Sequence, residues 1–161
     1  RGTKAYGKTI VGDGVLLMTG THIAHDCIVG NNVVMANLAT LGGHVEIGPW
    51  ANIGGGVMVH QFVKIGTQSL IGGGFTAKQD VPPYIVVSGA PLRFVGINKI
   101  GLERRGFDSE TRALIKKAYR TYFVSKFNRG QALDKIRKTM DQTQEIKKIL
   151  NFIESSERGI I

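Results

Sequence analysis

An aliphatic side chain recurs every six positions through the first half of the chain. Eleven consecutive steps of six fall on Val11, Leu17, Ile23, Val29, Met35, Leu41, Ile47, Ile53, Val59, Ile65 and Ile71. The residue two places earlier is always small or β-branched, and the residue that follows is usually Gly or Ala. Because strand side chains alternate between two faces, this hexad predicts a short strand with two inward residues, followed by a tight turn.

A strand and a turn in every hexad coil the chain into a prism, in which each coil pairs in parallel with the next about 4.8 Å away. A β-sandwich with glycine-rich turns is the alternative, but its strands do not keep one six-residue phase from Val11 to Ile71. The pattern resembles the hexapeptide-repeat acyltransferases. That resemblance implies a left-handed parallel β-helix with three faces, and therefore three hexads in each coil.

The second half of the chain has a different composition. All four prolines lie in residues 1–96, whereas residues 97–161 carry 15 Lys/Arg and 8 Asp/Glu, a net charge of +7. We expect the β-helix over residues 1–83 and a connecting loop over 84–96, because Pro82-Pro83 stops the repeat and Ser88–Pro91 is typical of turns. Apolar stripes of helical spacing then predict a C-terminal α-helical domain over 97–161, packed as a small bundle.

Composition excludes several classes of protein. No run of about 18 apolar residues is present, so we expect no membrane insertion. Cys27 is the only cysteine, which excludes a disulfide framework and a thiolate zinc cage and favours a reducing compartment. The chain starts at Arg1 without a Met, so we expect a fragment of a longer protein. The net charge of +9 suits an acidic partner or an ordinary solvated helix face; nucleic acid is not expected, because no aromatic-basic motif accompanies the charge.

At three hexads per coil, all four histidines fall on one edge of the prism. His25, Gly43 and Gln61 are spaced by 18 and form one column, and the other histidines flank it at His22, His44 and His60. Four unrelated surface histidines are the plain alternative. A zinc site is another. The γ-carbonic anhydrases bind zinc on this fold with a histidine pair five residues apart; no such pair occurs here, and we expect no metal.

Asp26 lies next to His25, which suits a base held by a carboxylate. Cys27 occupies an inward hexad position and is expected in the core, and no Ser pairs with a His at a triad-like spacing. The residues therefore indicate direct chemistry. His25 takes a proton from a substrate hydroxyl or amine, which attacks a thioester, and the Gly43 N–H stabilises the oxyanion.

A second column consists of glycines. Gly54–Gly56 and Gly72–Gly74 are 18 residues apart and should stack on one another. They are either tight corners or a smooth groove beside the histidines that suits an alkyl chain.

Several motifs occur together in order along the chain. They are His22-Ile23-Ala24-His25-Asp26, Gly42-Gly43-His44-Val45, His60-Gln61-Phe62, Asp80-Val81-Pro82-Pro83-Tyr84, Asn98, Gly101-Leu102 and Arg104-Arg105-Gly106-Phe107. The set resembles the bacterial UDP-N-acetylglucosamine O-acyltransferase family, which uses acyl-[acyl-carrier-protein] and begins lipid A synthesis. The stretch from Asp80 to Tyr84 is common to many hexapeptide enzymes, so the histidine motifs and the Arg104-Arg105 motif carry the resemblance.

The resemblance implies an enzyme that moves a (3R)-hydroxyacyl chain from acyl carrier protein to the 3-OH of UDP-N-acetylglucosamine. On this hypothesis His25 is the general base, Asp26 orients it and Gly43 donates the oxyanion N–H. The substrate would be bound by His22, His44, His60 and Gln61, the nucleotide by Asn98 and Arg105, the phosphopantetheine or the carrier by Arg104, and the end of the acyl chain by Gly73.

The resemblance also implies a homotrimer with sites between neighbouring β-helices, in the bacterial cytoplasm. No cofactor is expected, because phosphopantetheine arrives on the acyl carrier protein. The family has further N-terminal coils, and this chain has Pro91 and Ile100 where the family often has a His and an acidic residue. A 3-amino acceptor stays open. So do two different functions: a hexapeptide-repeat acyltransferase that uses acetyl-CoA, and a non-catalytic or metal-binding β-helix scaffold.

Overall fold

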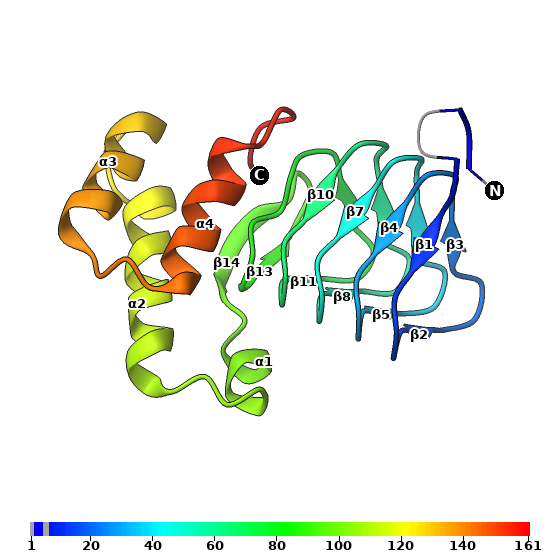
Figure 1. Ribbon diagram of the computed structural model, residues 1–161, viewed down its shortest axis with the longest axis horizontal. Coiled ribbons are helices and arrows are strands. Elements are labelled where there is room, and N and C mark those ends of the chain that lie inside the picture. The colour runs from blue at the N-terminus through cyan, green and yellow to red at the C-terminus, as the bar shows by residue number, and fades with distance from the viewer. Residues whose placement is uncertain (1, 5–6) are drawn as a thin grey trace.

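The computed structural model describes residues 2–4 and 7–161 (Figure 1). Its first half is a parallel β-solenoid of short strands, each of two residues. The strands are β1 (Ile10–Val11), β2 (Leu16–Leu17), β3 (His22–Ile23), β4 (Ile28–Val29), β5 (Val34–Met35), β6 (Thr40–Leu41), β7 (Glu46–Ile47), β8 (Asn52–Ile53), β9 (Met58–Val59), β10 (Lys64–Ile65), β11 (Leu70–Ile71) and β12 (Thr76–Ala77).

The strands form three parallel sheets that are the faces of the prism. The first face has the order β1-β4-β7-β10, the third has β12-β9-β6-β3, and the second has β14-β13-β11-β8-β5-β2. Ile10 pairs with Ile28 on the first face and His22 with Thr40 on the third, so each coil takes 18 residues. The predicted β-helix of three hexads per coil is confirmed.

The inward residues form the solenoid core. Both inward positions of each hexad are buried from the second coil onward, as in the pairs Cys27 and Val29 or Val33 and Met35. The corresponding Val11 and Leu17 lie in the end coil of the stack, where they remain 45% and 44% exposed.

Corners between faces require a left-handed residue. Three residues after the hexad aliphatic, the backbone has a positive φ: 58° at Asp26, 60° at His44 and 65° at Phe62. Since L-residues adopt this region at some cost, the corner selects Gly, Asn or a residue with a local reason to be there. The corners therefore place a recurring side chain at a fixed outward position.

The prediction of a connecting loop over 84–96 is wrong. This segment contains β13 (Ile85–Ser88) and β14 (Arg93–Ile97), which pair antiparallel. β13 also adds a parallel rung beside β11, and it buries Ile85 and Val87. The turn residues Ser88–Pro91 form only the tip of this hairpin, and the β-branched residues in front of them form its first strand. The predicted domain limits at 83 and 97 stay a prediction.

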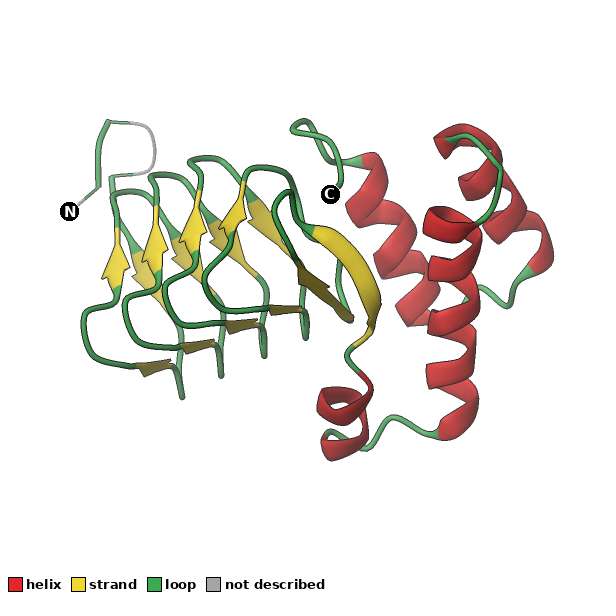
Figure 2. Cartoon of the chain, turned by 180° about the vertical axis from the view of Figure 1, so that it is seen from behind, coloured by secondary structure: helices red, strands yellow, loops and turns green. Residues whose placement is uncertain are grey.

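Helices follow the hairpin, as the apolar stripes predicted (Figure 2). They are α1 (Lys99–Arg104), α2 (Ser109–Tyr119), which continues into the π-helical turn η1 (Arg120–Val124), α3 (Arg129–Thr139) and α4 (Gln144–Glu154). The caps follow ordinary chemistry, because the side chains of Asp108, Asn128 and Thr143 accept N–H groups of the first turns of α2, α3 and α4.

The helical region is attached firmly to the end of the solenoid. Tyr119 is fully buried, and its hydroxyl donates a hydrogen bond to the Pro83 carbonyl at 2.6 Å. Phe94 of β14 stacks on Phe123, with ring centroids 4.7 Å apart. Among the described residues, no helix is both long enough and apolar enough to cross a membrane.

Candidate functional site

Three successive coils bring their corners between the third and first faces into one column, called the histidine edge here (residues 24–27, 42–45 and 60–63). Asp26, His44 and Phe62 are its three left-handed residues, spaced by 18. The His44 ring stacks on Phe62 with centroids 4.6 Å apart and planes 9° apart, and it meets His25 edge to face at 5.2 Å. Because the coil repeats exact spacing, side chains far apart in sequence are held in contact.

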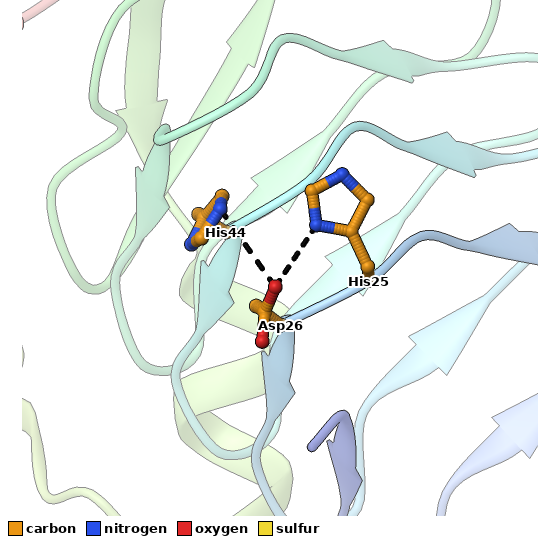
Figure 3. A group of neighbouring side chains, drawn as sticks. All are labelled: His25, Asp26 and His44. Carbon is orange, nitrogen blue, oxygen red and sulfur yellow. Dashed lines mark hydrogen bonds and ion pairs between the residues drawn. The ribbon is translucent and has the colours of Figure 1, made fainter. Parts of the chain in front are cut away.

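Asp26 lies between the two histidines (Figure 3). Its Oδ2 is 3.0 Å from Nδ1 of His25 and 3.8 Å from Nε2 of His44. The carboxylate is fully buried, and Thr3 closes over it: the Thr3 amide lies 3.0 Å from both oxygens and its hydroxyl donates to Oδ2 at 2.6 Å. The N-terminal segment thus completes the shell around Asp26.

The electrostatics of Asp26 decide the tautomer of His25. Burial by itself raises the pKa of the Asp26 carboxyl, but the hydrogen bonds from Thr3 and His25 and the nearby His44 outweigh it and hold the pKa well below its usual range. An ionised carboxylate only accepts hydrogen bonds, so Nδ1 of His25 must carry the proton. The lone pair is then on Nε2, on a ring whose side chain is 47% exposed.

Gly43 lies directly against the His25 ring. A Cβ at Gly43 would be 2.5 Å from Cε1 and 2.7 Å from Nε2 of His25, so no side chain fits there. At the equivalent corner position of the first coil, the Asp13 N–H donates to the Asn31 side chain at 2.9 Å. In the described part of the chain no acceptor is found for the Gly43 N–H, so this amide can serve a ligand beside His25.

The other predicted contacts at this edge differ in their surroundings. His22 faces outward from the third face and is exposed, paired through its backbone with Thr40. His60 and Gln61 are exposed at the histidine edge. Nδ1 of His60 is 3.2 Å from the Gln61 carbonyl and 3.2 Å from Nη2 of Arg158, a residue that the sequence patterns did not single out.

Asn98, Arg104 and Arg105 lie elsewhere in this chain. They line a pocket with Trp50, Leu70 and Ile100 at the corner between the first and second faces. Asn98 is buried; its side chain caps α1 and donates to the Gln68 carbonyl at 2.9 Å. The Arg105 guanidinium lies 4.4 Å above the Trp50 ring. A single chain therefore does not bring these residues to the histidines.

Gly73 stacks on Gly55, as the spacing of 18 predicted. A Cβ at Gly73 would lie 3.1 Å from the Gly55 carbonyl, and the Gly74 N–H donates to that carbonyl at 2.8 Å. The expectation that this column lies beside the histidines is wrong, because it forms the corner between the second and third faces. Gly43 and Gly55 are two hexads apart, so they occupy neighbouring edges with the third face between them.

His25, Asp26 and His44 also form a group that could hold a metal, with one ligand atom of each within 4.8 Å of the others. Imidazole and carboxylate are zinc ligands. Here the Asp26 oxygens are instead engaged by Thr3 and His25, so this carboxylate acts as a hydrogen-bond acceptor. Cys27 is buried, as predicted, and its thiol lies 3.1 Å from the Gly42 carbonyl.

Sequence reasoning missed three residues at this edge. Phe62 carried a signal, because it follows His44 by 18 and therefore had to stack on it. Thr3 and Arg158 carried none, because both lie outside the repeat and reach the edge only through the path of the chain ends.

Comparisons with known proteins agree with this architecture. The family model for UDP N-acetylglucosamine O-acyltransferase, domain 2, matches residues 80–161, and the model for bacterial transferase hexapeptide repeats matches residues 8–43. The chain belongs to the UDP-N-acetylglucosamine O-acyltransferase family. The match to residues 80–161 takes in the whole helical region.

Individual members of this O-acyltransferase family are similar along the whole chain. The acyl-[acyl-carrier-protein]--UDP-N-acetylglucosamine O-acyltransferase of Burkholderia mallei is 39% identical over 159 residues, which are 96% of this chain and 61% of that protein. The crystal structure of the Bacteroides fragilis UDP-N-acetylglucosamine acyltransferase superposes with a TM-score of 0.97 at 42% identity, covering 100% of this chain and 63% of that one. The chain thus spans about three-fifths of the length of the relatives it matches.

Proposed function

We propose that this protein transfers a (3R)-hydroxyacyl chain from acyl carrier protein to the 3-OH of UDP-N-acetylglucosamine, the first step of lipid A synthesis. One observation carries the proposal: in a member of this family, His25 is hydrogen-bonded to the buried Asp26 and lies against the bare backbone of Gly43. A base, its carboxylate and an amide donor thus lie within one corner of the solenoid.

The chemistry follows from that arrangement. Asp26 holds Nδ1–H of His25, so Nε2 takes the proton of the sugar hydroxyl as its oxygen attacks the thioester carbonyl. The tetrahedral oxyanion accepts a hydrogen bond from the Gly43 N–H. When the intermediate collapses, the C–S bond breaks and the imidazolium returns its proton to the departing phosphopantetheine thiolate. Neither a metal nor a cofactor enters these steps.

The remaining predicted residues bind substrate in this proposal. His22, His44, His60 and Gln61 position the sugar and the thioester around the histidine edge, and Asn98, Arg104 and Arg105 bind the nucleotide and the carrier arm. Since the two groups lie on different edges of one chain, the site requires a second chain. We propose a homotrimer in which neighbouring solenoids face each other.

The outer surface of the solenoid supports such an assembly. Large apolar side chains project from its faces and corners instead of from its core, with Met58 57% and Phe62 50% exposed. Leu38 and Trp50 are also exposed. Clusters of exposed apolar side chains on a folded protein mark contact surfaces.

The donor proposal rests on charge and on the glycine corner. Residues 97–161 carry a net +7, which suits an acidic acyl carrier protein in the bacterial cytoplasm. Gly73 leaves its corner without a side chain, so an acyl chain can pass there and its length can be sensed at that position. The acceptor is the 3-hydroxyl, and the 3-amino analogue is the second candidate because the same base can serve both.

The test is an acyl-transfer assay on the wild type and His25→Ala, with hydroxyacyl carrier protein or acetyl-CoA as donor and UDP-N-acetylglucosamine or its 3-amino analogue as acceptor. We expect transfer from the carrier protein, and a loss of about 10²–10⁴-fold or more in His25→Ala. The thermal unfolding curve should hardly change, because the His25 side chain is half exposed and leaves no core cavity. Turnover of His25→Ala within threefold of the wild type would reject His25 as base, and activity with acetyl-CoA alone would favour a different hexapeptide acyltransferase.

A further inference from the structure

The last six residues return from the helical region to the solenoid. α4 ends at Glu154, and the tail then runs back toward the coils (Figure 1). The Ser156 hydroxyl donates to Oδ2 of Asp80 at 2.7 Å. The Asp80 N–H donates to the Gly159 carbonyl at 2.9 Å, and the Ile161 N–H donates to the Asp80 carbonyl at 3.2 Å. The tail is therefore fixed to one residue by its backbone and a side chain.

Asp80 lies at the histidine edge, one coil beyond His60. It follows β12 of the third face and precedes Val81, which bridges to Ile65 of the first face. Asp80 is buried, and its Oδ1 accepts the Lys64 N–H at 2.8 Å. Since a buried carboxylate is costly unless its oxygens are satisfied, this anchor keeps the tail in a fixed place beside the site.

The anchored tail carries Arg158 to His60. Nη2 of Arg158 is 3.2 Å from Nδ1 of His60, and Nε and Nη2 each donate to the Lys78 carbonyl at 3.3 Å. The guanidinium is therefore held by the backbone of the coil next to the histidine. An arginine side chain has donors and no acceptor, so it bonds to Nδ1 only when that nitrogen carries no proton.

The Gln61 carbonyl makes the opposite demand. It lies 3.2 Å from the same Nδ1 and, as a carbonyl, can only accept a hydrogen bond. The two partners of Nδ1 are thus mutually exclusive: Arg158 favours the tautomer with the proton on Nε2, and Gln61 favours the tautomer with the proton on Nδ1.

We infer that Arg158 is a positioning residue that holds His60 in the Nε2–H tautomer. His60 then presents an N–H donor to an acceptor atom of the substrate and cannot act as a base at that nitrogen. This division of labour is the reverse of His25, whose Nδ1–H is held by Asp26 and whose Nε2 accepts. The part of the inference that concerns substrate rests on the proposed function, whereas the tautomer does not.

The tautomer is measured by ¹⁵N NMR of the imidazole nitrogens at a pH about two units above the ordinary histidine value near 6.5. We expect Nε2–H at His60 in the wild type. In Arg158→Met, which cannot donate, we expect the Nδ1–H form to become the main one, because the Gln61 carbonyl is then the remaining partner. Arg158→Lys should restore Nε2–H.

The control is Arg93→Met, which makes the same change at an exposed arginine of β14. It should leave the His60 signals unchanged. Ser156 and the tail backbone still bind Asp80 in every Arg158 variant, so the tail stays anchored. An unchanged His60 tautomer in Arg158→Met would overturn the inference.

Kinetics test the link to substrate. In the active protein we expect Arg158→Met to raise KM about threefold to tenfold, as for the loss of one hydrogen bond, with a smaller change in kcat. In a His60→Ala background the same change should have no further effect, whereas additive effects would show that Arg158 does not act through His60. A wild type without acyl transfer would refute the proposed function, and the NMR result would still decide the tautomer.

Discussion

Adding one methyl group at Gly43 tests the geometry of the candidate site with little disturbance of the solenoid. The Gly43 backbone does not have a positive φ, so alanine is compatible with it, and Gly43→Ala retains the N–H proposed to bind the oxyanion. The new Cβ has one obstacle, the His25 ring, at 2.5 Å from Cε1.

The size of the effect follows from the contact distance. Carbon atoms pack at about 3.5–4.0 Å, so the His25 ring has to retreat by about 1 Å or more. A retreat of that size lengthens the Nδ1–Oδ2 hydrogen bond with Asp26, now 3.0 Å, beyond bonding range. A misplacement of about 1 Å of a reacting group costs on the order of 10²-fold in rate. The cost in unfolding free energy should stay within about 1 kcal/mol, because the half-exposed ring can move toward solvent.

The assay compares kcat and thermal unfolding of the wild type, Gly43→Ala and Gly96→Ala. Gly96 in β14 is the matched control, since a Cβ there meets no atom within 4 Å and the backbone φ is not positive. We expect a loss of about 10²-fold in kcat for Gly43→Ala alone. If Gly43→Ala works within threefold of the wild type, the close packing of His25 on Gly43 does not set the position of the base.

Two further predictions concern Asp26 and Gly73. Because the pKa of Asp26 is lowered in the folded protein, its stabilising contribution is complete above the unfolded value of about 3.9 and is lost as the pH falls toward the folded value; the difference in unfolding free energy between wild type and Asp26→Asn should therefore be constant near pH 7 and shrink below about pH 4 in denaturant titrations. An equal difference at pH 7 and pH 3 would contradict it. Gly73→Met should block the glycine corner and shift preference toward shorter hydroxyacyl donors, by on the order of 10²-fold for four methylenes at about 0.8 kcal/mol each. An unchanged ratio of rates for a long and a short donor would make Gly73 a turn residue only.

The β-solenoid was determined by the sequence alone, for a local physical reason. A two-residue strand needs only an inward residue on either side of an outward one, and a corner needs a residue that tolerates its backbone. Each hexad states both requirements within six residues. Because the phase never slips between Val11 and Ile71, the spacing of 18 also fixed which corners stack, so His25 beside Gly43 and Gly73 on Gly55 followed from counting.

What the repeat does not encode was decided by the tertiary structure. Thr3 closes over Asp26 and Arg158 reaches His60 from segments outside the hexads, across 23 and 98 residues of chain. Such contacts have no period, and they depend on where the non-repeating ends are packed. The same holds for Asn98, which the hairpin of β13 and β14 delivers to Gln68, on a different edge from the histidines. A periodic sequence fixes the spacing of its coils, whereas the path of the segments that leave and rejoin them depends on packing of the whole chain.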